Sequence, residues 1–384
     1  MYKFFKKFLR LCIPPIVQSI HYRLPLNNFH SYWKKNKNRF KNVDKNNKKT
    51  IGNEIFEITE AFINSNSYKL ISNFWQYLNI KNYNSIIKNG LENYSQTIST
   101  NYYTFLEFNE NSISETVKNI ENVSIDYKIN LFKKHNLLNY EQSLNHNLIL
   151  LLIYENLKKT DSFSLLGSLN DETYLGYNDP FLEIGQLKVT QDKINSLLDY
   201  DTIKQISNFS NKDINVLEIG AGSGRTSEAL LTFKKDLTYV VCDIPLAIII
   251  SYKRLTKAFP NKKISILFNV NNITELEEAI LANDISFIFP HQLKLFSKKF
   301  FDLVLAIDCL HEMDKKTVKL YFNQINICSK YLYFSVWKKT NVPYSLNTYE
   351  FDKNHYAVPS NWELIFKNSS IFPSNFWNIC YKTT

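Results

Sequence analysis

The stretch VLEIGAGSGRTSEALL (Val216–Leu231) joins an apolar run to a helix-like segment through a glycine-rich loop. Gly220, Gly222 and Gly224 stand at alternate positions, where glycine allows the backbone to turn sharply and to approach a ligand closely. The helix-like segment that follows would present free N–H groups, which suit a carboxylate or a phosphate. The pattern predicts a ligand site. A glycine loop taken alone could also be an ordinary turn that binds no ligand.

Outward from this loop, short β-rich runs alternate with helix-like segments from residue 211 onward. Such alternation favours an α/β fold, with a mostly parallel, Rossmann-like sheet that carries helices on both faces. We expect strands at residues 214–219, 237–242, 264–268, 285–289, 301–307, 330–337, 362–366 and 376–381. We expect helices at residues 225–235, 245–258, 273–282 and 314–327. The last two strands have no helix between them, so an antiparallel C-terminal hairpin is predicted.

The chain has 384 residues, and the part before the glycine loop has a different pattern. Residues 51–206 carry apolar side chains mainly at helical spacing, so we expect a helical domain there. Residues 207–384 then form the Rossmann-like domain. Residues 1–50 are expected to be a basic N-terminal arm and linker, of which residues 34–49 would be mobile.

The net charge of +10 is unevenly distributed. Residues 1–50 contain thirteen Lys or Arg and a single acid, so the rest of the chain is nearly neutral. A nearly neutral body disfavours nucleic acid as a partner, because nucleic acid requires a basic face on the folded domain. Within residues 1–17, apolar and basic side chains fall on opposite helical faces, which indicates a peripheral contact with the anionic inner membrane. The alternative is an arm that packs on its own protein.

The five cysteines are scattered and odd in number, and none forms a CxxC pair. We therefore expect neither a disulfide framework nor a zinc site, and a reducing cytoplasm fits this pattern. We expect no other metal either. Asp308 and Glu312 could in principle bind a divalent ion, but we find no metal-binding signature around them.

Residues on either side of the loop narrow the class of ligand. Arg225 occupies the place where a dinucleotide fingerprint carries its third glycine, and Glu218 stands near the strand end, where it would meet an ammonium group. A ligand with an amino and a carboxylate end fits this loop better than a pyrophosphate. Asp243 ends the next strand, twenty-three residues after Gly220, where an acid accepts hydrogen bonds from two ribose hydroxyls. The alternative role for Asp243 is a helix N-cap before Pro245.

Adenosine with an amino-acid tail is S-adenosylmethionine, and at these residues the chain resembles the class I methyltransferases. The expected cofactor-binding residues are then Glu218, Gly220, Ala221, Gly222, Gly224, Arg225, Asp243, Ile244, Pro290, His291, Gln292 and Asp308. Within this set, the segment from Pro290 to Gln292 follows a strand and would border the adenine. An ordinary loop is the alternative for that segment.

The segment FDLVLAIDCLHEM (Phe301–Met313) places polar residues at the end of a further strand. In a doubly wound sheet this carboxyl end faces the ligand crevice. Methyl transfer requires an aligned acceptor whose proton is removed, so Asp308, His311 and Glu312 are the candidate catalytic residues. The alternative is that His311 and Glu312 only begin the next helix and interact with its dipole.

Five segments together resemble the bacterial sugar O-methyltransferase family: VLEIGAGSGRTSEALL, CDIPLAIIISYKRLTKAFPNKK, ISFIFPHQL, AIDCLHEMDKKTVKLYF and YAVPSNWELIF. The resemblance covers residues 70–384. It implies cytoplasmic, S-adenosylmethionine-dependent methylation of a sugar hydroxyl in a surface polysaccharide or its precursor. Family members often carry Gln at the position of His311, which favours Glu312 as the base. The alternatives are a methyltransferase for nucleic acid or another small molecule, and a cofactor-binding subunit without chemistry.

Overall fold

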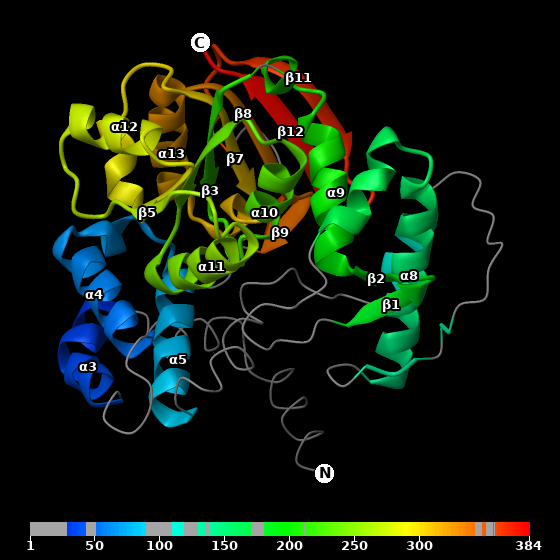
Figure 1. The fold of residues 1–384 in the computed structure, drawn as a ribbon, viewed down its shortest axis with the longest axis horizontal. Coiled ribbons are helices and arrows are strands. Elements are labelled where there is room, and N and C mark those ends of the chain that lie inside the picture. Colours follow the sequence, from blue (N-terminus) through cyan, green and yellow to red (C-terminus); the bar gives the residue numbers. More distant parts are fainter. Residues whose placement is uncertain are drawn as a thin grey trace.

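The computed structural model (Figure 1) describes residues 29–43, 51–89, 110–118, 130–131, 133–135, 139–169, 180–210, 212–341, 348–350, 356 and 358–384. The expected membrane contact of residues 1–17 lies outside the described residues. Within the described ranges, no helix combines the length and the apolar character needed to cross a bilayer.

An eight-stranded sheet forms the centre of the described structure, in the order β11-β12-β8-β7-β3-β4-β6-β5. Its strands are β3 (Ile214–Ile219), β4 (Leu237–Cys242), β5 (Ile264–Ile266), β6 (Ile285–Ile288), β7 (Phe301–Ile307), β8 (Ser329–Trp337), β11 (Glu363–Ser369) and β12 (Phe376–Lys382). The strands β8, β7, β3, β4, β6 and β5, which are neighbours in this order, run parallel to one another. Strand β12 is antiparallel to both β8 and β11. The predicted Rossmann-like sheet with its C-terminal hairpin is therefore confirmed.

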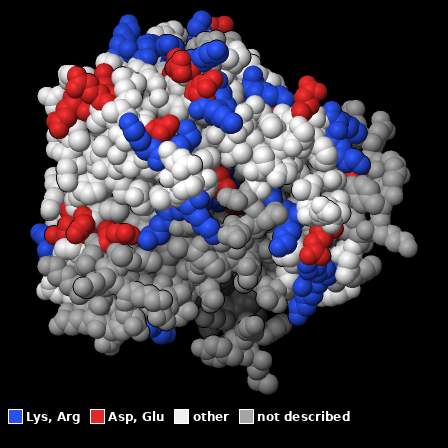
Figure 2. Space-filling view, viewed as in Figure 1, with Lys and Arg blue, Asp and Glu red and all other residues white. Residues whose placement is uncertain are grey.

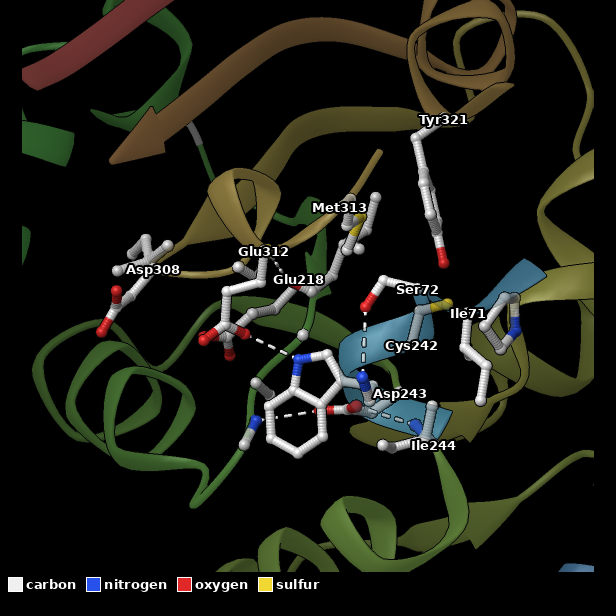
Figure 3. A pocket seen from close by; sticks show the side chains of 18 of the residues that line it. Ile71, Ser72, Glu218, Cys242, Asp243, Ile244, Asp308, Glu312, Met313 and Tyr321 are labelled. Atoms are coloured by element: carbon white, nitrogen blue, oxygen red, sulfur yellow. Dashed lines mark hydrogen bonds between the residues drawn. The ribbon is translucent and has the colours of Figure 1, made fainter. Parts of the chain in front are cut away.

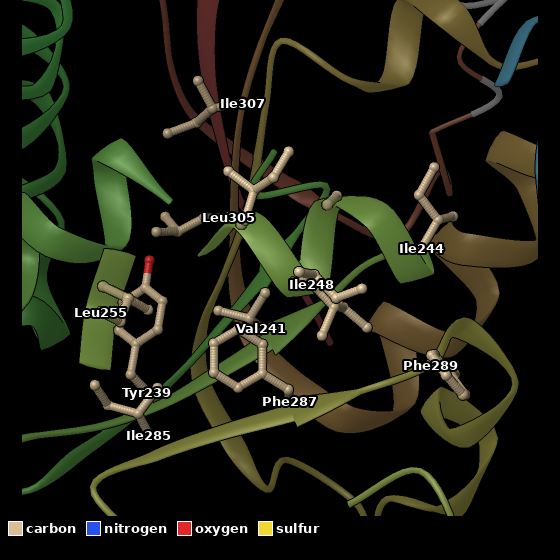
Figure 4. Close-up of a cluster of buried hydrophobic side chains, with 14 of the residues drawn as sticks. Tyr239, Val241, Ile244, Ile248, Leu255, Ile285, Phe287, Phe289, Leu305 and Ile307 are labelled. Carbon is tan, nitrogen blue, oxygen red and sulfur yellow. The ribbon is translucent and has the colours of Figure 1, made fainter. Parts of the chain in front are cut away.

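Helices cover both faces of this sheet: α10 (Arg225–Phe233), α11 (Pro245–Ala258), α12 (Ile273–Leu281) and α13 (Lys315–Cys328). One apolar cluster joins Val216 and Val241 to α10 and α11, and a second joins Leu217 and Val240 to α12 and α13. Successive strand residues point to opposite faces, so each central strand is buried on both sides and has a continuous apolar sequence. Figure 4 shows part of the first cluster, including Val241 of β4 and Ile248 of α11.

Three N-terminal helices and a short turn pack on the α11 side of the sheet: α3 (Phe29–Val43), α4 (Ile51–Asn64), η1 (Ser67–Leu70) and α5 (Asn73–Asn89). The expectation of a mobile linker is wrong for residues 34–43, which belong to α3. Phe29, Trp33 and Phe40 lie on one face of that helix and are buried. This apolar stripe holds a helix that is otherwise strongly basic against its neighbours.

A second N-terminal group has an apolar cluster of its own. It contains α7 (Glu110–Lys118), α8 (Tyr140–Leu157), η3 (Asp161–Ser168), β1 (Phe181–Ile184), β2 (Leu187–Thr190) and α9 (Gln191–Ile203). Figure 1 shows α8 with the β1–β2 hairpin at the right, apart from α3 to α5 at the lower left. Within residues 51–206, α4 and α5 share the core of the sheet, while α8 packs on α9.

Three short elements complete the described structure. They are η5 (Ser207–Ser210), which precedes β3, and the strands β9 (Lys339–Asn341) and β10 (Thr348–Glu350). Strands β9 and β10 pair with each other in an antiparallel ladder separate from the main sheet.

Candidate active site

A pocket lies at the carboxyl ends of β3, β4 and β7, where the loops after these strands meet (Figure 3). In a parallel sheet this edge is where ligands bind. The pocket holds about 1000 Å³ when the space open to solvent is included. Its lining residues are Leu70, Ile71, Ser72, Trp75, Glu218, Ile219, Gly220, Ala221, Gly222, Ser223, Arg225, Thr226, Cys242, Asp243, Ile244, Pro290, Ile307, Asp308, Cys309, Glu312, Met313 and Tyr321.

The glycine loop is held tightly between two neighbouring elements. Gly220 has a φ of 73°, and a Cβ atom there would lie 2.7 Å from the Cβ of Cys309, which follows β7. Gly224 has a φ of 76°, and a Cβ atom there would lie 3.0 Å from the Cβ of Ser251 in α11. Gly224 begins α10 without a side-chain cap, and Thr226 in the first turn lines the pocket. The loop therefore presents backbone and a helix N-terminus to a ligand.

Asp243, the acid after β4, is oriented by two backbone groups. Its Oδ2 accepts a hydrogen bond from the N–H of Gly222 at 2.9 Å, and its Oδ1 accepts one from the N–H of Ile244 at 2.7 Å. The N-cap of α11 is Ile244, so Asp243 does not cap that helix. Burial raises the pKa of the Asp243 carboxyl to about 7, against the opposing effect of the two N–H groups.

Glu218, near the end of β3, lines the pocket, and hydrogen bonds from two neighbouring elements orient its carboxylate. Its Oε2 accepts hydrogen bonds from the hydroxyl of Ser227 in α10 and from that of Tyr239 in β4, the latter at 2.9 Å. Burial raises the pKa of the Glu218 carboxyl, although both hydroxyls oppose this. Glu218 therefore lines the pocket with a carboxylate that two hydroxyl groups of the protein orient.

Arg225 forms an ion pair that the sequence pattern did not indicate. Its Nη1 lies 2.8 Å from Oδ2 of Asp199 on α9, and only about a tenth of each side chain is exposed. Burial raises the pKa of the Asp199 carboxyl, and the guanidinium of Arg225 opposes that rise. Because its charge is already paired, Arg225 contributes less positive potential to the pocket than its formal charge suggests.

Asp308 and Glu312 follow β7, and both line the pocket (Figure 3). Asp308 has a φ of 58°, which is uncommon for a residue with a side chain. Its side chain is 26% exposed, yet desolvation by the surrounding protein raises its pKa to about 7. Burial and the neighbouring charge of Asp308 raise the pKa of Glu312 to about 8. Glu312 is therefore suited to exchange a proton near neutral pH.

His311 does not line this pocket, although its two carboxylate neighbours do. Its ring stacks on Trp337 with centroids 4.8 Å apart and meets the edge of Phe376 at 5.7 Å. Its Nε2 lies 3.4 Å from Oδ1 of Asp308. The short turn η7 (Leu310–Glu312) directs residues 311 and 312 to different sides. His311 thus contacts Asp308 rather than the space where a ligand would bind.

The segment after β6 reaches the pocket at one residue only. It forms η6 (Pro290–Leu295), and Pro290 lines the pocket as expected. The Nδ1 atom of His291 lies 2.6 Å from the hydroxyl of Ser67, beside a different, mainly apolar pocket. The side chain of Gln292 is buried and bonds the backbone of Phe289, Leu267 and Val270. His291 and Gln292, which the sequence analysis expected to bind the cofactor, therefore do not line this pocket.

Part of the pocket wall comes from a region where the sequence contains no compact motif. Leu70, Ile71, Ser72 and Trp75, around the start of α5, line the pocket. The indole Nε1 of Trp75 donates a hydrogen bond to Oε2 of Glu312 at 2.6 Å. The available signal was the resemblance, which already begins at residue 70, but it assigned no role to these side chains.

Charge distinguishes this pocket from an ordinary apolar one. Among the described residues that line it, four are carboxylates, at positions 218, 243, 308 and 312, and one is a cation, at position 225. Each carboxyl has a raised pKa, mainly because of burial. A cationic ligand would favour the ionised form of all four. In the described ranges, no group of three or more His, Cys, Asp or Glu side chains is arranged to hold a metal ion.

Comparison with known proteins yields similarity only among solved structures. No protein-family model matches the sequence, and no curated protein matches it. A SAM-dependent methyltransferase from Aquifex aeolicus is 12% identical over 48% of this chain and 90% of that chain, with a TM-score of 0.34. A magnesium protoporphyrin IX methyltransferase from Synechocystis PCC 6803, with bound SAH, is 11% identical over 52% of this chain and 90% of that chain, with a TM-score of 0.35.

Proposed function

We propose that this protein binds S-adenosylmethionine in the pocket and transfers its methyl group to a hydroxyl acceptor. The observation that carries the proposal is the acidic lining, with four carboxylates against one paired cation. S-adenosylmethionine bears a sulfonium and an ammonium against a single carboxylate, so its net positive charge complements this lining. A dinucleotide bears a pyrophosphate, which four carboxylates would repel.

The residues present fit such a ligand from end to end. Asp243 is held by two backbone N–H groups in one orientation, which prepares it to accept hydrogen bonds from ribose hydroxyls. The first turn of α10 supports a carboxylate end, and Glu218 supports an ammonium end. Ile244 and Pro290 provide apolar contacts for the base.

When bound, the cofactor supplies an electrophilic methyl group. Glu312 would accept the proton of the acceptor hydroxyl while the hydroxyl oxygen takes the methyl group, and the thioether left behind would be neutral. The raised pKa of Glu312, about 8, makes its ionised form a stronger base than an exposed carboxylate, and a cationic cofactor in the pocket would favour that ionised form. The charge of Asp308 acts on Glu312, and Asp308 would add a negative charge to the pocket that favours a cationic ligand.

For the acceptor, we propose a sugar hydroxyl of a bacterial surface polysaccharide or its precursor, methylated in the cytoplasm. The resemblance over residues 70–384 motivates this choice. The rings of Trp75 and Tyr321 in the pocket wall support it, because aromatic faces pack on the apolar face of a sugar. Figure 2 shows Lys and Arg interspersed with Asp and Glu on the visible described surface, which favours a sugar over a nucleic acid.

Calorimetry with purified protein tests the cofactor. We expect S-adenosylmethionine to bind and NAD⁺ not to bind, and binding of NAD⁺ with no response to S-adenosylmethionine would reject the proposal. Mass spectrometry of surface glycans from a strain that lacks the gene tests the acceptor. We expect the loss of one methylene unit from a sugar residue. Unchanged glycans together with tight cofactor binding would favour another acceptor or a binding subunit.

A further inference from the structure

The contact between Trp75 and Glu312 joins two distant parts of the chain in the pocket. The indole Nε1 donates to Oε2 of Glu312 at 2.6 Å, across 237 positions of sequence. Both residues line the pocket, and Figure 3 labels Glu312 there. Among the described residues, Trp75 is the hydrogen-bond donor to the Glu312 side chain. It is the point at which the N-terminal helices reach the expected base.

The position of Trp75 is itself fixed by the start of its helix. The hydroxyl of Ser72 accepts a hydrogen bond from the backbone N–H of Trp75 at 3.3 Å, as an N-cap residue does. Ser72 and the preceding Ile71 are buried. The first turn of α5 is therefore anchored, and the indole is presented to Glu312 from a supported backbone.

We propose that Trp75 is a positioning residue, whose indole N–H holds the Glu312 carboxylate in the orientation in which it takes the proton of the acceptor. This inference rests on the proposed function, since it assigns the role of base to Glu312. The hydrogen bond occupies Oε2, so the proton transfer is assigned to Oε1. Trp75 does not act on the acceptor proton itself.

Electrostatics gives the contact a second effect. Burial and the charge of Asp308 favour the protonated form of Glu312, whereas the indole N–H favours the ionised form. A protonated Glu312 cannot accept a proton. Trp75 thus keeps a larger fraction of the base in its active form at neutral pH than the pocket would otherwise allow.

The first test is the pH dependence of methyl transfer by Trp75→Phe, which keeps an aromatic ring and removes the N–H. We expect the rise of kcat with pH to move upward by about 1 pH unit, because a lost hydrogen bond to a charged group raises the pKa by roughly that amount. The KM for S-adenosylmethionine should stay within a factor of about 3, because a change confined to the base leaves ground-state binding intact. An unshifted profile would overturn the proposal.

A matched control removes the same kind of hydrogen bond elsewhere. The indole of Trp33 on α3 donates to Glu60 on α4, outside the pocket. Trp33→Phe therefore loses an indole–carboxylate bond without touching Glu312. We expect it to lower the melting temperature and to leave the pH profile of kcat unchanged. A shift as large as that of Trp75→Phe would mean that the effect is a general loss of stability.

A second test needs no methyl transfer, so it separates this inference from the proposed function. In ligand-free protein, the melting temperature should fall with rising pH until Glu312 is ionised. Trp75→Phe should extend that fall to higher pH, and the difference should vanish when both proteins also carry Glu312→Gln. Persistence of the difference in the Gln background would overturn the role of Trp75. Its disappearance in an enzyme without methyl transfer would reject the function alone.

Discussion

The carboxylate of Asp243 accepts a hydrogen bond from the backbone N–H of Gly222 at 2.9 Å, which ties the end of β4 to the loop after β3. The two segments are neighbours because β3 and β4 pair in parallel, with Ile219 opposite Cys242. The acid and the glycine loop are therefore one unit: the loop orients the acid, and the acid orients the loop. A ligand that binds one of them also contacts the other.

The Asp243→Asn substitution tests what the negative charge of Asp243 contributes to cofactor binding, apart from the shape of its side chain. The amide keeps the size of the side chain but loses the negative charge and one strong acceptor for a ribose hydroxyl. We expect the affinity for S-adenosylmethionine to fall by about 10- to 100-fold, as for a lost hydrogen bond to a charged group. Calorimetry measures this. Asp284→Asn is the control, because Asp284 bonds Lys262 and the backbone of Lys263 away from the pocket.

Replacing Gly220 by Ala should displace the loop. The new Cβ would lie 2.7 Å from that of Cys309, and the φ of 73° is unfavourable for Ala. We expect a loss of about 2 kcal/mol or more in the free energy of unfolding, together with weaker cofactor binding. Gly185→Ala is the matched control, because Gly185 has a φ of 61° but no atom within 4 Å of the added Cβ. It should show the backbone strain alone and retain cofactor binding in calorimetry.

Stability and cofactor affinity should respond to pH in opposite directions. The pKa values of Asp243 and Asp308, about 7, and of Glu312, about 8, lie above those of an unfolded chain. The folded state therefore holds protons that the unfolded state has released, and these groups contribute stability at pH 4 that is lost as the pH rises towards 8. We expect the melting temperature of the ligand-free protein to fall over this range, measured by calorimetry.

Affinity for the cationic cofactor should instead rise from pH 6 to pH 9, since ionised carboxylates attract it.

The control for the melting-temperature prediction is Asp308→Asn, which removes one of the titrating groups. Its melting temperature should depend less on pH than that of the unsubstituted protein. An equally steep dependence would show that groups other than Asp308 are responsible.

His311 and Glu312 can be separated by amide substitution. His311→Gln should leave kcat close to that of the unsubstituted protein, because His311 packs between Trp337 and Phe376 and does not line the pocket. Glu312→Gln should lower kcat by about 100-fold or more while the cofactor still binds. The measurement is methyl transfer under saturating cofactor. The reverse ranking of the two variants would return the role of base to His311.

Much of the fold could be predicted from local sequence. The bounds of β3, β4, β7 and α11 agree with those expected, because an apolar run, a following acid and a proline act over only a few neighbouring residues. The same local signals identified Gly220, Asp243 and Glu312 as pocket residues, since each directly follows or lies close to the end of a parallel strand. The arrangement of the strands then brings these ends together.

Local sequence was a poor guide where tertiary contacts determine the structure of a segment or the role of a side chain. The basic run of residues 34–49 suggested a mobile linker, yet residues 34–43 are helical because Trp33 and Phe40 are buried on α4 and α5. The position of Gln292 after a strand suggested a ligand contact, yet its amide binds three backbone groups. A polar residue that follows a strand can form hydrogen bonds either with a ligand or with the protein backbone, and the sequence does not distinguish these two roles.

By itself, the sequence of this protein determined a mostly parallel sheet and a ligand loop at its carboxyl edge, because strand periodicity and glycine conformation are local properties. Only the tertiary structure decided which side chains face the ligand space. It turned His311 away, paired Arg225 with Asp199 and brought Trp75 to Glu312. Such contacts depend on packing between segments far apart in the chain, and no short stretch of residues encodes them.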